Sequence, residues 1–298
     1  MNRCFRTLLA LGLMAFAPLA WCADKIPVVA SFSILGDIVS VVGGDRVVVT
    51  SLVGPDQDAH VFEPTPVDVK KVAQAHMVVI NGLGFEGWIA RLAKSAGYRK
   101  EIVVASAGVR ARTMSAEEGH GRQTDPHAWQ DPNNVIVYVR NIAEKLAALD
   151  PAGAAEYRAN SQRYIAELTK LDEWIVAQYA QTPATRRRII TSHDAFGYHG
   201  ARYGIELLAP QGMSTESEAS AKDVANLIRQ IRREHIKAVF MENMSNAKLI
   251  SQLARDAGVT LAGELYPDAL SKADGPAPTY LNLMRYNVNQ IAEAMKKN

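Results

Sequence analysis

The chain has 298 residues, of which 48% are hydrophobic and 21% charged, so it can bury a sizeable core and is neither disordered nor collagen-like. The length favours two domains, or two lobes of one domain. Lys and Arg number 33 against 31 Asp and Glu. A net charge this close to zero argues against a nucleic-acid partner.

Residues 1–23 have the pattern of a secretory signal peptide. MNRCFR supplies a positive start, and TLLALGLMAFAPLA is an apolar run too short for a typical membrane span. Small residues at Ala20, Cys22 and Ala23 predict cleavage near residues 22–23 and a soluble periplasmic protein. LAWC resembles a lipid-attachment box ending at Cys22, but Trp21 stands where such boxes need Gly or Ala. Lipid anchoring and an uncleaved N-terminal anchor are therefore the alternatives that we disfavour.

Both cysteines, Cys4 and Cys22, fall inside this segment or at its edge. The mature chain would then have no disulfide and no thiolate ligand. A metal bound by this protein would have to be held by His, Asp and Glu side chains.

Short β-branched runs alternate with helical patterns along the mature chain, which is typical of parallel α/β units. In the first half we expect strands at 28–32, 47–52, 77–81 and 102–105, and helices at 34–42, 66–75, 87–96 and 133–149. In the second half we expect strands at 188–191, 206–208, 238–242 and 260–264, and helices at 195–203, 221–235, 247–257 and 280–296. The fold class is therefore α/β, with two lobes that each contain a mainly parallel sheet flanked by helices.

One long helix is expected between the lobes, at residues 152–180. Asp150-Pro151 is a helix start signal, and Thr182-Pro183 is a stop. An apolar stripe keeps helical spacing between them, and about 29 residues give a stiff rod of roughly 43 Å. We divide the chain into a signal peptide (1–23), an N-terminal metal-binding lobe (24–150), a linking helix (151–182) and a C-terminal metal-binding lobe (183–298).

Four candidate metal ligands stand where strands or loops end. His60 follows the second strand in GPDQDAHVFEPTP, His127 precedes a helix in TDPHAWQDPNN, His193 follows a strand in ITSHDAFGYHG, and Asp268 follows the last strand in GELYPDALS. Ligands of parallel α/β sheets bind outside the carboxyl ends of strands, which places all four at the cleft between the lobes. Three imidazoles and a carboxylate suit Zn²⁺. Taken singly, each histidine fits a structural or surface position as well.

These segments resemble the signature of the cluster A-I metal-binding proteins of ABC importers, the zinc and manganese solute-binding family. The similarity runs from about Ile26 to the C-terminus and includes DAHVFEPTP, DPHAWQDPNN, TSHDAFGY, STESEASAKDVANLIRQI and LYPDALS with GPAPTYLNLMRYN. Ala59 and Phe62 depart from the family pattern, which has Pro and Tyr there. The resemblance implies a metal held by His60, His127, His193 and Asp268.

Other polar residues near the motifs receive different expectations. Asp125 and Asp131 flank His127 and either orient its ring or serve in caps and turns. Glu242, at the end of a strand, is expected to hydrogen-bond rather than to ligate. His199 is not expected to be a ligand. His120 lies in a polar stretch, SAEEGHGRQT (115–124), that we expect to be an exposed loop.

The resemblance implies a periplasmic solute-binding protein that captures Zn²⁺ and delivers it to the membrane permease and ATPase of an ABC importer. Manganese is the alternative cargo, although manganese members commonly place Glu where this chain has His193. An exported zinc hydrolase is disfavoured because four protein ligands leave no open position for water, and no HExxH helix is present. A binding protein without metal is a further alternative. We expect a monomer without enzymatic activity, and a chaperone that delivers the metal is a further candidate partner.

Overall fold

The first lobe is built on a four-stranded parallel sheet. The computed structural model describes residues 24–114, 123–212, 214–215 and 219–298. The strand order is β2-β1-β3-β4, formed by β1 (Ile26–Phe32), β2 (Val47–Val53), β3 (Met77–Ile80) and β4 (Ile102–Val104). Val28 of the central strand lies between Val49 and Met77 of its neighbours. Runs of Val and Ile suit strands that are covered on both faces, which explains why these segments form this sheet.

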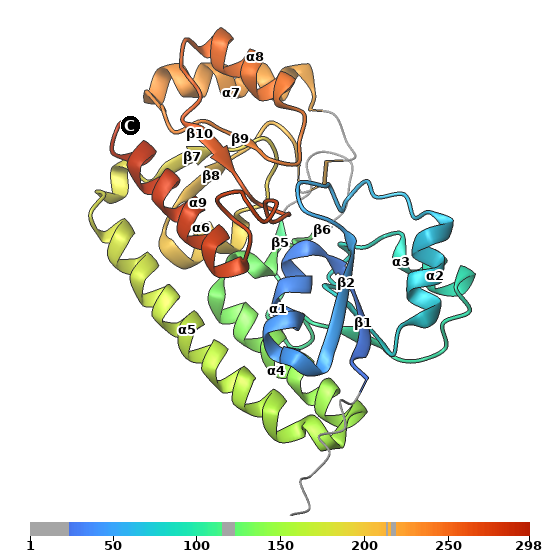
Figure 1. Ribbon diagram of the computed structural model, residues 1–298. Coiled ribbons are helices and arrows are strands. Elements are labelled where there is room, and N and C mark those ends of the chain that lie inside the picture. Colours follow the sequence, from blue (N-terminus) through green and yellow to red (C-terminus); the bar gives the residue numbers. More distant parts are fainter. Residues whose placement is uncertain (1–23, 115–122, 213, 216–218) are drawn as a thin grey trace, which may run out of the picture.

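Helices cover this sheet, and two of them begin at local start signals (Figure 1). Thr65 and Asp68 form a capping box at α2 (Pro66–Gln74), and the Asp131 carboxylate caps α4 (Pro132–Leu149) by accepting from the backbone N–H of Asn133. Each of these helices has proline at its first position, where the missing N–H costs nothing. The lobe also contains α1 (Ser33–Gly43) and α3 (Ile89–Ser95).

The second lobe pairs its strands as β7 (Arg188–Ile190) with β8 (Glu206–Leu208), and β9 (Phe240–Glu242) with β10 (Gly263–Leu265). Both pairs are parallel, and a parallel bridge between Ile190 and Val239 connects them. The flanking helices are α6 (Gly197–Tyr203), α7 (Ala221–Glu234), α8 (Ala247–Ala257) and α9 (Tyr280–Met295). The predicted class, two α/β lobes with parallel sheets, is confirmed.

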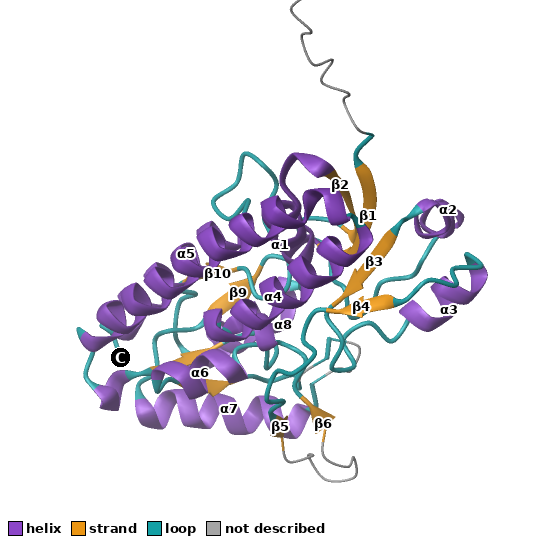
Figure 2. Ribbon diagram, turned by 90° about the horizontal axis from the view of Figure 1, so that it is seen from below, coloured by secondary structure: helices purple, strands orange, loops and turns teal. Residues whose placement is uncertain are grey.

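The long joining helix is also confirmed. A 3₁₀ turn at Pro151–Gly153 precedes α5 (Ala154–Ala180), which has 27 residues. Figure 1 shows α5 running diagonally along both lobes, and Figure 2 shows it beside α4 from below. Its predicted apolar stripe is buried at six positions, and Ile165 is partly buried; the six are Tyr157, Tyr164, Leu168, Leu171, Ile175 and Tyr179.

The larger of two apolar clusters extends through both lobes. It runs from Phe32 in β1 through Leu168 in α5 to Leu265 in β10 and Tyr280 in α9. A second, smaller cluster lies beneath α7 and α8 around Ile231. Because the larger cluster is continuous, opening the lobes widely would expose packed apolar surface. Within the described residues, no helix has both the length and the apolar character needed to cross a membrane.

The structure corrects several predicted boundaries. The last strand lies at Gly263–Leu265 rather than 260–264, α3 starts at Ile89 rather than 87, and α6 starts at Gly197 rather than 195. The end of the stretch predicted as a loop, at 115–124, pairs instead: β6 (Gln123–Thr124) forms an antiparallel ladder with β5 (Thr113–Met114). The signal peptide and residues 115–122, with His120, lie outside the described residues.

Candidate metal centre

The structure brings the four predicted side chains together. One ligand atom from each of His60, His127, His193 and Asp268 lies within 4.8 Å of all the others. The Nε2 atoms of His60 and His127 are 3.3 Å apart, and Asp268 Oδ2 lies 3.3 Å from His60 Nε2 and 3.0 Å from His193 Nε2. Asp268 Oδ1 lies 3.7 Å from His127 Nε2. Two ligands come from each half of the chain.

The centre is buried, and three of its polar atoms lack hydrogen-bond partners in the described part of the chain. His127, His193 and Asp268 are 0% exposed, and His60 is 9% exposed. His193 Nε2 and both carboxylate oxygens of Asp268 have no hydrogen-bond partner among the described residues. Buried polar atoms without partners are costly, and a cation placed between them would satisfy all of them at once. The residues present therefore fit a bound divalent cation.

Asp125 fixes the ring of His127. One carboxylate oxygen, Oδ1, lies 2.9 Å from His127 Nδ1 and also accepts the backbone N–H of His127 at 3.0 Å. A carboxylate at Nδ1 selects the tautomer that carries its proton there and leaves the Nε2 lone pair free to bind a metal. Of the two roles considered for each flanking aspartate, Asp125 therefore orients the imidazole and Asp131 caps α4.

Glu242 performs the same task for His193 from the end of β9. Its Oε2 lies 2.7 Å from His193 Nδ1, and its Oε1 accepts the backbone N–H groups of Ser192 and His193 at 3.0 and 3.1 Å. Ser245 donates a further hydrogen bond to Oε2. Glu242 hydrogen-bonds, as expected, and lies outside the group of four ligand atoms.

The loop that carries His60 is held by contacts on both sides of the imidazole. The backbone N–H of His60 donates to Asp58 at 2.9 Å, and the carbonyl of Ala59 accepts from the Trp88 indole at 2.9 Å. The ring of Phe85 meets that of His60 edge to face, with centroids 4.8 Å apart. Ala59, which replaces the family's proline, is fully buried. This loop is therefore fixed without the proline.

The loop that carries Asp268 belongs to the second lobe, but side chains of the first lobe hold it. Trp129 Nε1 and Gln130 Nε2 both donate to the carbonyl of Pro267, at 2.8 and 2.7 Å. Both donors are fully buried. Sequence reasoning missed these two residues, although they lie in the same DPHAWQDPNN segment as His127.

Electrostatics couple the centre strongly. Burial lowers the pKa of the His193 imidazole, but the carboxylates of Glu242 and Asp268 outweigh burial and raise it well above its usual value. Burial raises the pKa of Asp268, while His193 and His127 oppose it and hold the pKa well below its usual range. In the metal-free protein, a proton on His193 therefore stabilises the Asp268 carboxylate.

The remaining histidines among the described residues are not part of the centre. His199 is buried, with Nε2 2.9 Å from the Tyr179 hydroxyl and Nδ1 3.1 Å from the carbonyl of Gln130. Burial lowers its pKa to about 4, so it is neutral and structural. His235 adopts a left-handed conformation at the end of α7, and His76 is exposed.

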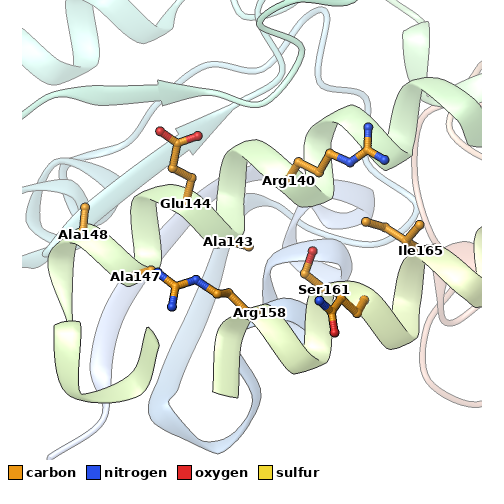
Figure 3. A pocket seen from close by; sticks show the side chains of 9 residues that line it. Arg140, Ala143, Glu144, Ala147, Ala148, Arg158, Ser161 and Ile165 are labelled. Carbon is orange, nitrogen blue, oxygen red and sulfur yellow. The ribbon is translucent and has the colours of Figure 1, made fainter. Parts of the chain in front are cut away.

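A groove between α4 and α5 is wide but unrelated to the centre. Its volume is about 700 Å³, and its lining includes Arg140, Glu144 and Arg158, as Figure 3 shows. None of the four ligand side chains lines it. This groove therefore lies apart from the four candidate ligands.

Two α/β lobes joined by a long helix, with a buried cluster of imidazoles and a carboxylate at their junction, define a metal-binding receptor of an importer. A family model described as "Zinc-uptake complex component A periplasmic" (ZnuA) matches residues 28–294. The chain belongs to this family. It is a substrate-binding protein of a metal ABC transporter and not an enzyme, and such a component works with a membrane permease and an ATPase.

Known relatives differ in the metal that they are named for. The manganese-binding lipoprotein MntA of Halalkalibacterium halodurans is 32% identical over 274 residues, covering 92% of this chain and 90% of its own. The iron transporter lipoprotein MtsA of Streptococcus pyogenes serotype M1 is 30% identical over 281 residues, covering 92% and 90%. The solved periplasmic zinc-binding protein TroA of Treponema pallidum is 30% identical, with a TM-score of 0.86 and coverage of 91% and 99%.

Proposed function

We propose that this protein captures Zn²⁺ with His60, His127, His193 and Asp268 and delivers it to the permease of an ABC importer. The observation that carries the proposal is the convergence of three imidazole nitrogens and one carboxylate in a buried space. Tetrahedral Zn²⁺ with bonds of about 2.1 Å separates its ligand atoms by roughly 3.4 Å. Four of the six pairs lie 3.0 to 3.7 Å apart, which brackets that value, and no pair of ligand atoms is more than 4.8 Å apart.

The donor set supports zinc over harder cations. Imidazole nitrogen suits Zn²⁺, whereas carboxylate, carbonyl and water oxygens suit Mn²⁺, and the Irving–Williams order favours Zn²⁺ at a given site of this kind. His193 decides how many nitrogen ligands the site has, because a carboxylate at this position would leave two imidazoles and two carboxylates. Its orientation by Glu242 at 2.7 Å keeps the imidazole nitrogen directed at the cluster.

Manganese is the second candidate cargo, and two observations favour it. Relatives such as MntA are named for manganese. Both oxygens of Asp268 are buried and without hydrogen-bond partners, so the carboxylate is free to bind through both of them. A bidentate carboxylate with three imidazoles gives five donors, which is closer to the higher coordination number of a hard cation than to a tetrahedron.

Metal affinity and transport separate these candidates. Protein purified without a polyhistidine tag and stripped of metal should bind one Zn²⁺ per chain in a competition titration. Because Zn²⁺ outcompetes Mn²⁺ at most nitrogen-containing sites, cellular uptake of labelled Zn²⁺ and Mn²⁺ must accompany the titration. Uptake of zinc that depends on this chain supports the proposal, and uptake of manganese alone would replace it. Failure to bind either metal would overturn the site itself.

His193→Glu provides the matched variant. Exchanging one nitrogen donor for a carboxylate should lower the preference for Zn²⁺ over Mn²⁺ by about tenfold or more, because a harder donor set suits Mn²⁺ better. The control is Asp172→Glu on α5, which changes a carboxylate that hydrogen-bonds Arg202 and lies outside the metal cluster. An unchanged metal preference in His193→Glu would contradict the role given to His193.

We infer a periplasmic location from the signal-peptide pattern and from the similarity to TroA, which is named as a periplasmic protein. MntA and MtsA are named as lipoproteins and TroA as a periplasmic protein, so acylation of Cys22 is the alternative to cleavage near residues 22–23. Mass analysis of the mature N-terminus separates these outcomes. The lobe boundaries at 150 and 183, a monomeric state and a delivering chaperone remain predictions.

A further inference from the structure

The four ligand side chains are not equally shielded from solvent. The side chain of His60 is 5% exposed to solvent, whereas the side chains of His127, His193 and Asp268 are 0% exposed. A metal ion that arrives from solvent exchanges its waters for protein ligands one at a time. The geometry therefore makes His60 the ligand that an incoming ion can contact first.

His60 faces a cavity of about 530 Å³. Its lining includes the loop between β3 and α3, with Gly84 and Gly87, and strand β6, with Gln123 and Thr124. We call this cavity the vestibule. One water occupies about 30 Å³ of the liquid, so the vestibule has room for a divalent cation together with six waters.

The glycines of the loop between β3 and α3 leave space in the vestibule. Gly82, Leu83 and Gly84 have φ of 84°, 57° and 87°, a run of left-handed conformations that bends the backbone sharply. A Cβ added at Gly84 or Gly87 would meet no atom of the described residues within 4 Å, so no side chain of that part of the protein fills the space in front of them. Gly87 is not in the left-handed region, and a side chain there would project into open space without backbone strain.

A second cavity beside the His60 loop lacks this access. It has a volume of about 490 Å³ and is lined by Asp58 and Val61, on either side of His60, and by Lys248 of α8. None of the four ligand side chains lines it. Of these two cavities, only the vestibule has one of the four ligand residues in its lining.

We propose that the vestibule is the route by which metal reaches and leaves the centre, and that His60 is its first ligand on arrival and its last on departure. This inference rests on the proposed function. The route predicts a kinetic signature: an obstruction slows arrival and departure by the same factor, because both pass the same point. The equilibrium affinity, which is the ratio of the two rates, stays unchanged.

Gly87→Trp and Thr124→Trp place an indole in the vestibule from two different lining segments, and Lys248→Trp places one in the second cavity as a control. Stopped-flow mixing with Zn²⁺ and a fluorescent chelator gives both rate constants, and thermal unfolding verifies the fold. Each vestibule variant should slow association and dissociation by about tenfold, with an unchanged Kd, while Lys248→Trp keeps both rates. Should Gly87→Trp not fold, Thr124→Trp on the exposed strand decides the question alone.

The outcomes separate the two proposals. Wild-type protein that binds no metal refutes the proposed function. Wild-type binding with unchanged rates in the folded vestibule variants, or equal slowing by Lys248→Trp, refutes the route while leaving the metal centre intact. A raised Kd with an unchanged association rate would show that the indoles disturb the bound state, and would also refute the route.

Discussion

The hydroxyl of Ser33, the first residue of α1, accepts a hydrogen bond from the backbone N–H of Leu270 at 3.0 Å. These residues are 237 positions apart, and Leu270 lies two residues beyond Asp268. The carbonyl of Leu270 in turn accepts from the backbone N–H of Asp56. With Trp129 and Gln130 on the carbonyl of Pro267, the first lobe holds the Asp268 loop on both sides of the carboxylate. Asp268 is thus fixed to the lobe that supplies His60 and His127.

Ser33→Ala tests this anchoring. The substitution leaves the buried N–H of Leu270 without a partner, which should cost about 1–3 kcal/mol in the free energy of unfolding. The loop should then be less well fixed, and zinc affinity should fall by up to about tenfold. Chemical unfolding and competition titration measure the two effects. Ser40→Ala is the control, because that hydroxyl donates only to Gly36 within the same helix. If Ser33→Ala and Ser40→Ala had the same stability and the same zinc affinity, the hydrogen bond from Leu270 to Ser33 would not fix the Asp268 loop.

The ligands themselves give the strongest expected effects. His60→Ala, His127→Ala and His193→Ala should each weaken Zn²⁺ binding by about 100-fold or more, since loss of even an outer partner costs 10- to 100-fold. Titration against a chelator of known affinity measures this. His199→Ala is the matched control: it removes a buried histidine that bonds Tyr179, so the melting temperature should fall while one zinc per chain is retained. Wild-type affinity in all three ligand variants would exclude the site.

Much of the fold could be predicted because the strands of the first lobe are Val-rich runs and the helices start at Thr65-Pro66 and Asp131-Pro132. The sequence predicts that the last strand begins at residue 260, because Thr260 and Leu261 are residue types that favour strands. In the structure, the ladder with β9 begins only at Gly263. The antiparallel ladder of β5 and β6 has two residues in each strand, too few to show an alternating pattern.

The ligand positions were suggested by strand ends, and the resemblance to a known family singled out these four. The anchoring of Asp268 could not be predicted in the same way. The acceptor is the backbone carbonyl of Pro267, and every residue has such a carbonyl, so the residue type does not reveal the contact. Nothing in the sequence around Trp129 and Gln130 indicates a distant partner. Only the fold brings these two side chains to Pro267, more than 130 positions away.

Zinc binding should release protons at neutral pH. The raised pKa of His193 means that this imidazole holds a proton in the metal-free protein, and the metal must displace it. The apparent Kd should therefore rise about tenfold for each unit by which the pH falls, for every proton displaced. Calorimetry in buffers of different ionisation enthalpy measures the proton count.

Glu242→Gln is the companion variant for this measurement. Without the Glu242 carboxylate, the pKa of His193 should fall, so fewer protons should be released per zinc bound at pH 7. In the metal-free wild type, a raised pKa gives a stabilisation that is complete below the unfolded value of about 6.5 and is lost as the pH rises through the folded value. Proton release that is identical in both proteins would contradict the coupling between the two side chains.

Asp37 is a carboxylate that joins the lobes away from the metal. It lies on α1, and its Oδ2 accepts the backbone N–H of Tyr280, the first residue of α9, at 2.8 Å. Burial raises the pKa of Asp37 to about 6, and the hydrogen bond from Tyr280 opposes that rise only in part. Since the unfolded pKa is near 4, the ionised carboxylate is tolerated less well in the folded protein than in the unfolded chain.

Asp37→Asn should therefore stabilise the metal-free protein, and more so as the pH rises. A raised folded pKa gives wild-type stability that is present below about pH 4 and is lost as the pH passes 6. The amide has no charge to bury and can still accept from Tyr280. Relative to wild type, the free energy of unfolding should then increase by about 1–3 kcal/mol between pH 4.5 and 7.5, as measured by denaturant unfolding with chelator present. Asp45→Asn, at a fully exposed carboxylate, should show no such pH dependence. If Asp37→Asn lost as much stability with rising pH as wild type, the ionised Asp37 carboxylate would not destabilise the folded protein. The hydrogen bond from Tyr280 would then offset its burial.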